Sequence, residues 1–129
     1  MSWATYKNTI DAVLTDNNYR EVPENKMVEN AASSHNHQSY SLKQIGTSDI
    51  IETTSNGFQY SHLVILEVRY KNINSSERHV NVDSYLSLFN AIAALSEYKG
   101  TISAPTFEDI DEKHSKMSFK FLFGEEIQC

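Results

Sequence analysis

The residues of this 129-residue chain with the clearest capacity for chemistry are two histidines in one polar stretch. One residue, Asn36, separates His35 from His37, so an extended backbone would point both imidazoles to the same side. Such a pair could begin a zinc site, which needs two more ligands. His62, His79 and His114 each fall in a different predicted element and have no second ligand nearby. We therefore interpret these three as structural residues and predict no metal site.

Other catalytic arrangements find little support in the sequence. Cys129, the last residue, lacks a neighbouring base that would activate a thiolate. The acids Glu108, Asp109, Asp111 and Glu112 cluster where a turn is predicted, and solvation there would leave them without the environment that acid–base catalysis requires. The four glycines are too far apart to build a phosphate-binding loop. We expect no enzyme activity and no cofactor.

Composition limits the classes of protein to which the chain can belong. Its length and its 40% hydrophobic residues fit one domain over residues 1–129. With 17 acidic residues against 11 Lys and Arg, the net charge of −6 argues against binding to nucleic acid. The apolar runs Leu63–Leu66 and Leu86–Leu95 are too short to span a membrane. We also expect no secretory signal, and a single cysteine fits a reducing compartment.

The N-terminal third predicts a helix, a long surface segment and a strand. The helix runs from an N-cap at Ser2 to Asn17-Asn18, and its apolar positions are Trp3, Tyr6, Ile10, Val13 and Leu14. Residues Pro23–Ser39 are mostly polar, and a segment of that length tends to be functional or disordered. Alternation at Tyr40, Leu42 and Gln44 then predicts a strand before Gly46.

The middle of the chain predicts a long β-hairpin. Ile50–Thr54 and Phe58–Tyr70 flank the sequence Ser55-Asn56-Gly57, and Asn-Gly between two strand patterns favours a type I′ turn. The second strand places alternate residues on one face, which makes it a central strand: Tyr60, His62, Val64, Leu66, Val68 and Tyr70.

The C-terminal half predicts a second helix and two more strands. After the polar loop Asn72–Ser76, apolar residues recur at helical spacing and the helix ends near Tyr98, with Gly100 as its C-cap. The helical apolar positions are Val82, Tyr85, Leu86, Leu88, Phe89, Ile92, Ala93 and Leu95. Ile102–Ile110 and Lys116–Phe123 form a hairpin that buries Met117, Phe119, Phe121 and Phe123. We predict an α+β fold: an antiparallel sheet with a long hairpin and two helices on one face.

This order of elements resembles the tail terminator proteins of long-tailed bacteriophages. The resemblance covers nearly the whole chain as a pattern of loosely similar segments. It is carried by Trp3-Ala4-Thr5-Tyr6, by Glu21-Val22-Pro23-Glu24-Asn25-Lys26, by Ser33-Ser34-His35 with Tyr40-Ser41-Leu42, by the segment 60–70, by Phe107-Glu108-Asp109 and by 119–123.

The resemblance implies a structural virion protein with no active site. Such a subunit forms a ring, expected to be a hexamer, on the head-proximal end of the tail tube, where it ends elongation and meets a connector or stopper protein of the head. It would assemble in the host cytoplasm. DNA would pass through the ring without specific binding, and an acidic channel lining would suit that passage.

We expect the two features that exceed a minimal core, the segment Pro23–Ser39 and the hairpin Ile50–Tyr70, to contact other subunits. The predicted interface residues are Glu24, Asn25, Lys26, Ser34, His35, His37, Ser55, Asn56, Gly57 and Phe58. Three alternatives stay open at this level. They are a head-completion or connector ring protein, a small metal-dependent or acid–base enzyme using the His35 and His37 pair, and an adaptor that binds a peptide along a sheet edge.

Overall fold

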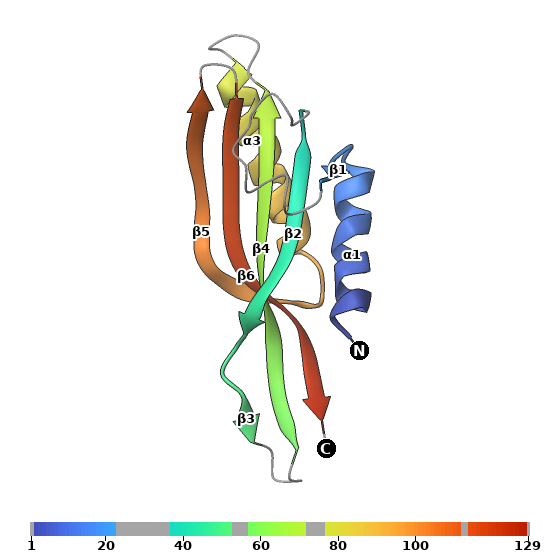
Figure 1. Cartoon of the computed structure of the whole chain (residues 1–129). Coiled ribbons are helices and arrows are strands. Elements are labelled where there is room, and N and C mark those ends of the chain that lie inside the picture. Colours follow the sequence, from blue (N-terminus) through green and yellow to red (C-terminus); the bar gives the residue numbers. More distant parts are fainter. Residues whose placement is uncertain (1, 23–36, 53–56, 72–76, 112–113, 129) are drawn as a thin grey trace.

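In the part of the chain that the structure describes, two helices and one mixed sheet make up the fold (Figure 1). The computed structural model describes residues 2–22, 37–52, 57–71, 77–111 and 114–128. In chain order the elements are α1 (Trp3–Asp16), β1 (Arg20–Glu21), β2 (Ser39–Thr47), β3 (Ile51–Glu52), β4 (Phe58–Lys71), α3 (Glu77–Ala93), β5 (Tyr98–Asp111) and β6 (His114–Gln128). The sheet order is β1-β2-β4-β6-β5, with β3 pairing β4. The predicted α+β class is confirmed.

Helix α1 begins and ends where the sequence predicts. Ser2 holds the N-cap position with an extended backbone, although its side chain makes no capping bond. At the other end Asn18 adopts a positive φ of 67°, and the amides of Asn18 and Tyr19 bond the carbonyls of Thr15 and Leu14. This pair of bonds is the Schellman ending, in which a left-handed residue satisfies the last carbonyls of a helix.

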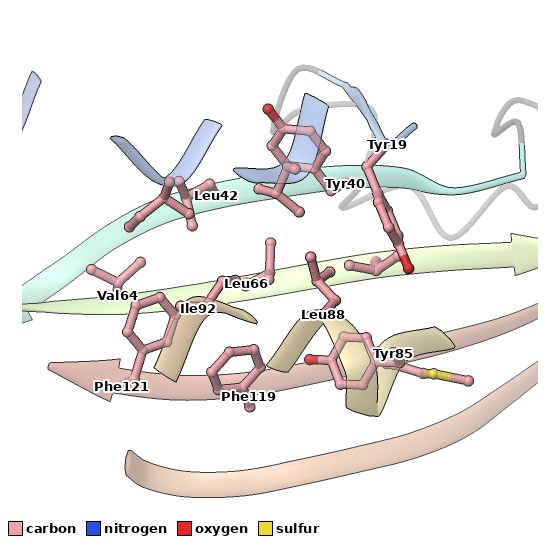
Figure 2. Packing of buried hydrophobic residues seen from close by; sticks show 14 of the residues in the cluster. Tyr19, Tyr40, Leu42, Val64, Leu66, Tyr85, Leu88, Ile92, Phe119 and Phe121 are labelled. Carbon is pink, nitrogen blue, oxygen red and sulfur yellow. The ribbon is translucent and has the colours of Figure 1, made fainter. Parts of the chain in front are cut away.

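The core lies between the two helices and one face of the sheet. Figure 2 shows Tyr85, Leu88 and Ile92 of α3 packed against strand residues such as Val64 and Phe121. The predicted faces of α1 and of the C-terminal strand are confirmed as buried: Tyr6, Ile10 and Leu14, and Met117, Phe119, Phe121 and Phe123. One prediction for α3 is wrong, because Leu86 is 40% exposed. It lies one residue after buried Tyr85 and two before Leu88, outside the narrower stripe that faces the sheet.

Strand β4 is the central strand, as predicted. It pairs antiparallel with β2 on one side and with β6 on the other. The sheet is not wholly antiparallel, however, because β1 pairs parallel with β2 through Arg20 and Ser39. Ser39 is therefore the first residue of a strand and is buried, where the sequence placed it in a surface segment.

The predicted hairpin around Asn56-Gly57 forms with a different connection. Glu52 pairs with Phe58, which leaves five residues between the two strands rather than the two of a type I′ turn. The long partner of β4 on this side is β2, and β3 contributes two residues.

The C-terminal half departs from prediction at the end of the helix. Helix α3 ends at Ala93, and Tyr98 already begins β5. Gly100 has a φ of 134° at a register shift within β5, so it serves a strand irregularity and not a helix cap. The hairpin of β5 and β6 is longer than predicted, and Glu108 and Asp109 lie within β5, as the predicted strand Ile102–Ile110 placed them.

Two predicted segments lie largely outside the described residues. These are the part of the surface segment from Pro23 to residue 36 and the loop Asn72–Ser76. In the described ranges, no helix is long and apolar enough to cross a membrane.

Buried tyrosine hydroxyls predict a loss of stability in alkali. Burial raises the pKa of Tyr70, as do the charge of Tyr19 and a 2.6 Å bond between the two hydroxyls, and burial also raises the pKa of Tyr85. Because the folded-state pKa values are raised, the free energy of unfolding is unaffected by these tyrosines below their unfolded-state pKa of about 10. It falls as the pH rises above that pKa, since the unfolded chain then loses protons that the folded chain keeps. We expect urea unfolding to report a decrease of about 1.4 kcal/mol per pH unit for each tyrosine above pH 10. Tyr85→Phe should make the decrease shallower, and a stability unchanged to pH 11.5 would contradict the expectation.

Candidate functional site

A narrow ribbon extends from the body of the protein beyond the ends of both helices (Figure 1). We call residues 48–52, 58–61 and 125–128 the projecting ribbon; it contains β3, the first part of β4 and the last part of β6. The register joins Ile51 to Gln59, and Gln59 in turn to Ile127. The ribbon therefore has three strands in its middle, and neither of the described helices covers it.

The projecting ribbon exposes large apolar side chains. Ile51 is 60% exposed and Ile127 is 61% exposed, and both flank Gln59 on one face of the ribbon. Phe58, which precedes Gln59 in β4, is 48% exposed and points to the other face because strand side chains alternate. Large apolar side chains are therefore exposed on both faces of the ribbon, and exposed apolar surface of this kind is typical of contact surfaces.

The same ribbon has a one-sided charge. Its exposed residues include three acids, Asp49, Glu52 and Glu125, while a fourth, Glu126, is buried, and the ribbon contains neither Lys nor Arg. The side chain of Glu125 accepts a hydrogen bond from the Gln59 amide within the ribbon. An apolar surface with an acidic border favours a partner surface that is apolar and basic.

The ribbon is attached to the helix-covered part of the sheet, the body, through contacts of Tyr6 in α1. We call Tyr6, His62, Gly124, Glu125 and Glu126 the joint. The Tyr6 hydroxyl donates to the carbonyl oxygen of Glu125 at 2.9 Å and accepts from the Glu125 amide at 3.1 Å. Gly124 adopts a φ of 77° directly under the Tyr6 ring, where an added Cβ would lie 2.5 Å from Cε2. The glycine thus lets β6 pass close to α1 and change direction.

A buried polar chain lies in this joint. His62 donates from Nε2 to Glu126 Oε1 at 3.1 Å, and its Nδ1 accepts from the Gln44 amide at 2.7 Å. His62 is 5% exposed and Glu126 is 9% exposed. The rings of Trp3, Tyr6 and Tyr60 surround the imidazole, with centroids 5.6 to 5.9 Å away. Both ring nitrogens of His62 are therefore used in fixing three strands to one another.

We expect His62→Leu to lower the free energy of unfolding by about 2 kcal/mol. The buried carboxylate of Glu126 then loses the imidazole as its hydrogen-bond donor. Chemical denaturation of His62→Leu, Glu126→Gln and the double variant measures the coupling between the two side chains. A coupling below about 0.5 kcal/mol would mean that the pair does not hold the joint.

The predicted interface residues are only partly described. Glu24, Asn25, Lys26, Ser34, His35, Ser55 and Asn56 lie outside the described residues. His37 lies beside the last residues of β4, where its Nδ1 accepts from the Lys71 amide at 3.1 Å. Phe58 begins β4, and Gly57 before it is buried. The structure does not bring His37 and Phe58 together, because a 14-residue strand, about 40 Å long, separates them.

Sequence reasoning misses the residues that complete the ribbon and its joint. Ile127 is missed because Gly124 interrupts the alternation after Phe123, so the predicted strand ends too early. A histidine at an apolar strand position is a usable signal for His62. Its partner Glu126 could not be predicted, since the register shift between Tyr60 and His62 decides which β6 residue faces the imidazole.

The described residues offer few groups for bond-breaking chemistry. Among them, no three His, Cys, Asp or Glu side chains are close enough together to hold a metal ion. A cavity of about 390 Å³ lies between the end of α1 and α3. Asp83 is the one carboxylate of its described lining, and the Tyr19 hydroxyl there is shared with Tyr70. That lining therefore lacks the second positioned group that acid–base catalysis uses.

Comparison with known proteins adds no family to this description. No family model matches the chain, and no curated protein matches it significantly.

Proposed function

We propose that the chain is a structural virion subunit that forms a ring, with six copies expected, on the head-proximal end of a phage tail tube. The ring would end elongation of the tube and offer a surface to a connector or stopper protein of the head. The order of elements resembles that of tail terminators, and the projecting ribbon is the observation that supports the proposal most directly.

The ribbon supports an assembly role because a monomer gains nothing from its exposure. Ile51, Phe58 and Ile127 lie in water beyond the helices, yet the joint under Tyr6 fixes the ribbon to the body. A rigid apolar projection is preorganised for a contact, since little conformational entropy is lost when it is covered. A contact between two different surfaces can repeat from copy to copy. It forms a closed ring when the rotation between neighbouring copies adds up to a full turn.

The edge-binding adaptor finds less support in the described strands. Strand β5 forms one edge of the sheet and is 14 residues long. Its pairing with β6 shifts register four times, and Pro105 falls within it. Bulges and proline on an edge strand oppose the addition of another strand. A connector ring protein of the head would also use an exposed apolar ribbon for assembly, and it is the nearest alternative.

Tube length tests the proposal against that alternative. Tail-tube subunits of the same virus are polymerised with and without this chain, and the tubes are measured by electron microscopy. A terminator should bind one end of each tube and stop its growth at low molar ratio. Density on capsids alone, with tubes growing unchanged, would instead indicate a head-completion protein.

A further inference from the structure

The cavity of about 390 Å³ between α3 and the end of α1 plays no part in the proposed assembly. One stripe of α3 forms one of its walls, because residues three and four positions apart share a helix face. This stripe consists of Val80, Asp83, Ser84 and Ser87. The opposite wall lies where the chain leaves α1 and where it enters β2, and consists of Asn17, Tyr19 and Gln38. The volume is within the range of about 300 to 1,000 Å³ that is usual for ligand sites.

The wall opposite α3 is fixed by hydrogen bonds and by an uncommon backbone conformation. Gln38 has a φ of 60°, which few residues with a side chain adopt, and its carbonyl oxygen accepts from the Arg20 amide at 2.9 Å. The Tyr19 hydroxyl is buried and bonded both to the Tyr70 hydroxyl, at 2.6 Å, and to the Gln38 side chain. A wall held in this way loses little conformational entropy when a ligand binds.

The groups that the cavity still offers to a ligand are mainly hydrogen-bond acceptors. Asn17 donates from its amide nitrogen to the Val13 carbonyl at 2.7 Å, so its side-chain oxygen is left as an acceptor. Within the described part of the chain, no hydrogen bond or ion pair engages the side chains of Asp83, Ser84 or Ser87. The described lining also contains no Lys, Arg or His. The cavity therefore combines one negative charge with several acceptors from two walls.

A planar cation with several N–H donors complements these groups. A guanidinium group presents five donors in one plane and keeps its charge at all physiological pH values, whereas an ammonium group presents three. A carboxylate such as that of Asp83 accepts two guanidinium N–H groups side by side. Three donors then remain for the serine hydroxyls and the Asn17 oxygen. An anion would be repelled by Asp83, and a neutral ligand would leave that charge without a partner.

We propose that this cavity binds a guanidinium group, supplied either by a small molecule or by an arginine side chain of a partner protein. The inference goes beyond the proposed ring and does not depend on it. Because Asp83 is exposed, water screens the ion pair, and we expect a dissociation constant on the order of 1 mM for the isolated group.

Titration of the full chain with N-acetyl-arginine amide, followed by heteronuclear NMR, is the first test. Saturable shifts are expected for the side-chain amides of Asn17 and Gln38 and for the backbone amides of Ser84 and Ser87. N-acetyl-citrulline amide, a neutral probe of nearly the same shape, should bind at least about fivefold more weakly. Equal binding of the two probes, or no saturable shift with the arginine probe at about 10 mM, would overturn the proposal.

Asp83→Asn removes the charge from the cavity and keeps the size of the side chain. Asp83 is exposed, so this variant should fold like the native chain, and circular dichroism checks this. Its affinity for the arginine probe should be at least about fivefold lower. Asp49→Asn is the matched control, because it removes an exposed carboxylate of the projecting ribbon. Equal losses in the two variants would mean that the net charge attracts the probe, and the cavity would not be its site.

Binding to partner proteins identifies the source of the guanidinium group. The native chain and Asp83→Asn are compared for affinity to tail-tube and connector subunits of the same virus. A loss of at least about tenfold toward one of them, with competition by the arginine probe, would assign the group to an arginine of that partner. Unchanged affinity for both, with the probe still bound, would assign it to a small molecule. The probe titration uses the chain alone, so failure of the proposed ring does not affect its result.

Discussion

Replacing Gly124 with alanine is expected to lower the free energy of unfolding by about 3 kcal/mol, the sum of a left-handed backbone and an overpacked contact. The φ of 77° disfavours any side chain, and the new Cβ would lie 2.5 Å from the Tyr6 ring. That ring cannot move aside cheaply, because its hydroxyl bonds both the amide and the carbonyl of Glu125. Urea or guanidinium denaturation measures the loss.

Gly46→Ala is the matched control for this prediction. Its φ is not in the left-handed region, and an added Cβ would meet Leu63 Cδ2 at an ordinary 3.8 Å. We expect a change below about 0.5 kcal/mol, as for surface substitutions generally. Equal effects at the two glycines would show that close packing under Tyr6 does not decide the path of β6.

Replacing the ribbon residues Ile51 and Ile127 with glutamine is expected to weaken assembly about a thousandfold while leaving the fold intact. Burial of an isoleucine contributes about 2 kcal/mol, so losing two amounts to about 4 kcal/mol, and each 1.4 kcal/mol is a factor of about ten in affinity. Ile51 and Ile127 are more than half exposed in the single chain, so Ile51→Gln with Ile127→Gln should change the unfolding free energy little. Sedimentation or light scattering over a concentration series measures the shift.

Val80→Gln provides the control for the ribbon variant. Val80 of α3 is 62% exposed and lies outside the ribbon, so its replacement removes a similar apolar group without touching the proposed contact. Assembly equally sensitive to Val80 would mean that apolar exposure in general, and not the ribbon, drives association.

Much of the fold could be predicted because local pattern and burial agree. The buried faces of α1, β4 and β6 follow directly from spacing, since apolar positions such as Ile10, Leu66 and Phe121 all meet the same core. The end of α3 could not be predicted, because Leu95 and Tyr98 continue an apolar pattern although they pack on the core from outside the helix. Periodicity alone does not distinguish a last helical turn from a compact connection.

The candidate site was predictable in outline and not in detail. Phe58 and the predicted Asn-Gly turn pointed to the end of the molecule where the ribbon lies, because Asn-Gly marks a place where the chain reverses. The ribbon's third strand and its His62–Glu126 joint depend on a register shift in β6, and no local sequence signal fixes a shift between strands distant in the chain.

The central claim, that the chain is a ring-forming subunit of the tail end, is tested most directly by its native mass. Light scattering is performed across a concentration series of the full chain, alone and with tail-tube subunits of the same virus. A ring-forming subunit should give a closed species of six times the 14.7 kDa chain mass, formed alone or only when tubes are present. A chain that stays monomeric at all concentrations and is indifferent to tubes would contradict it.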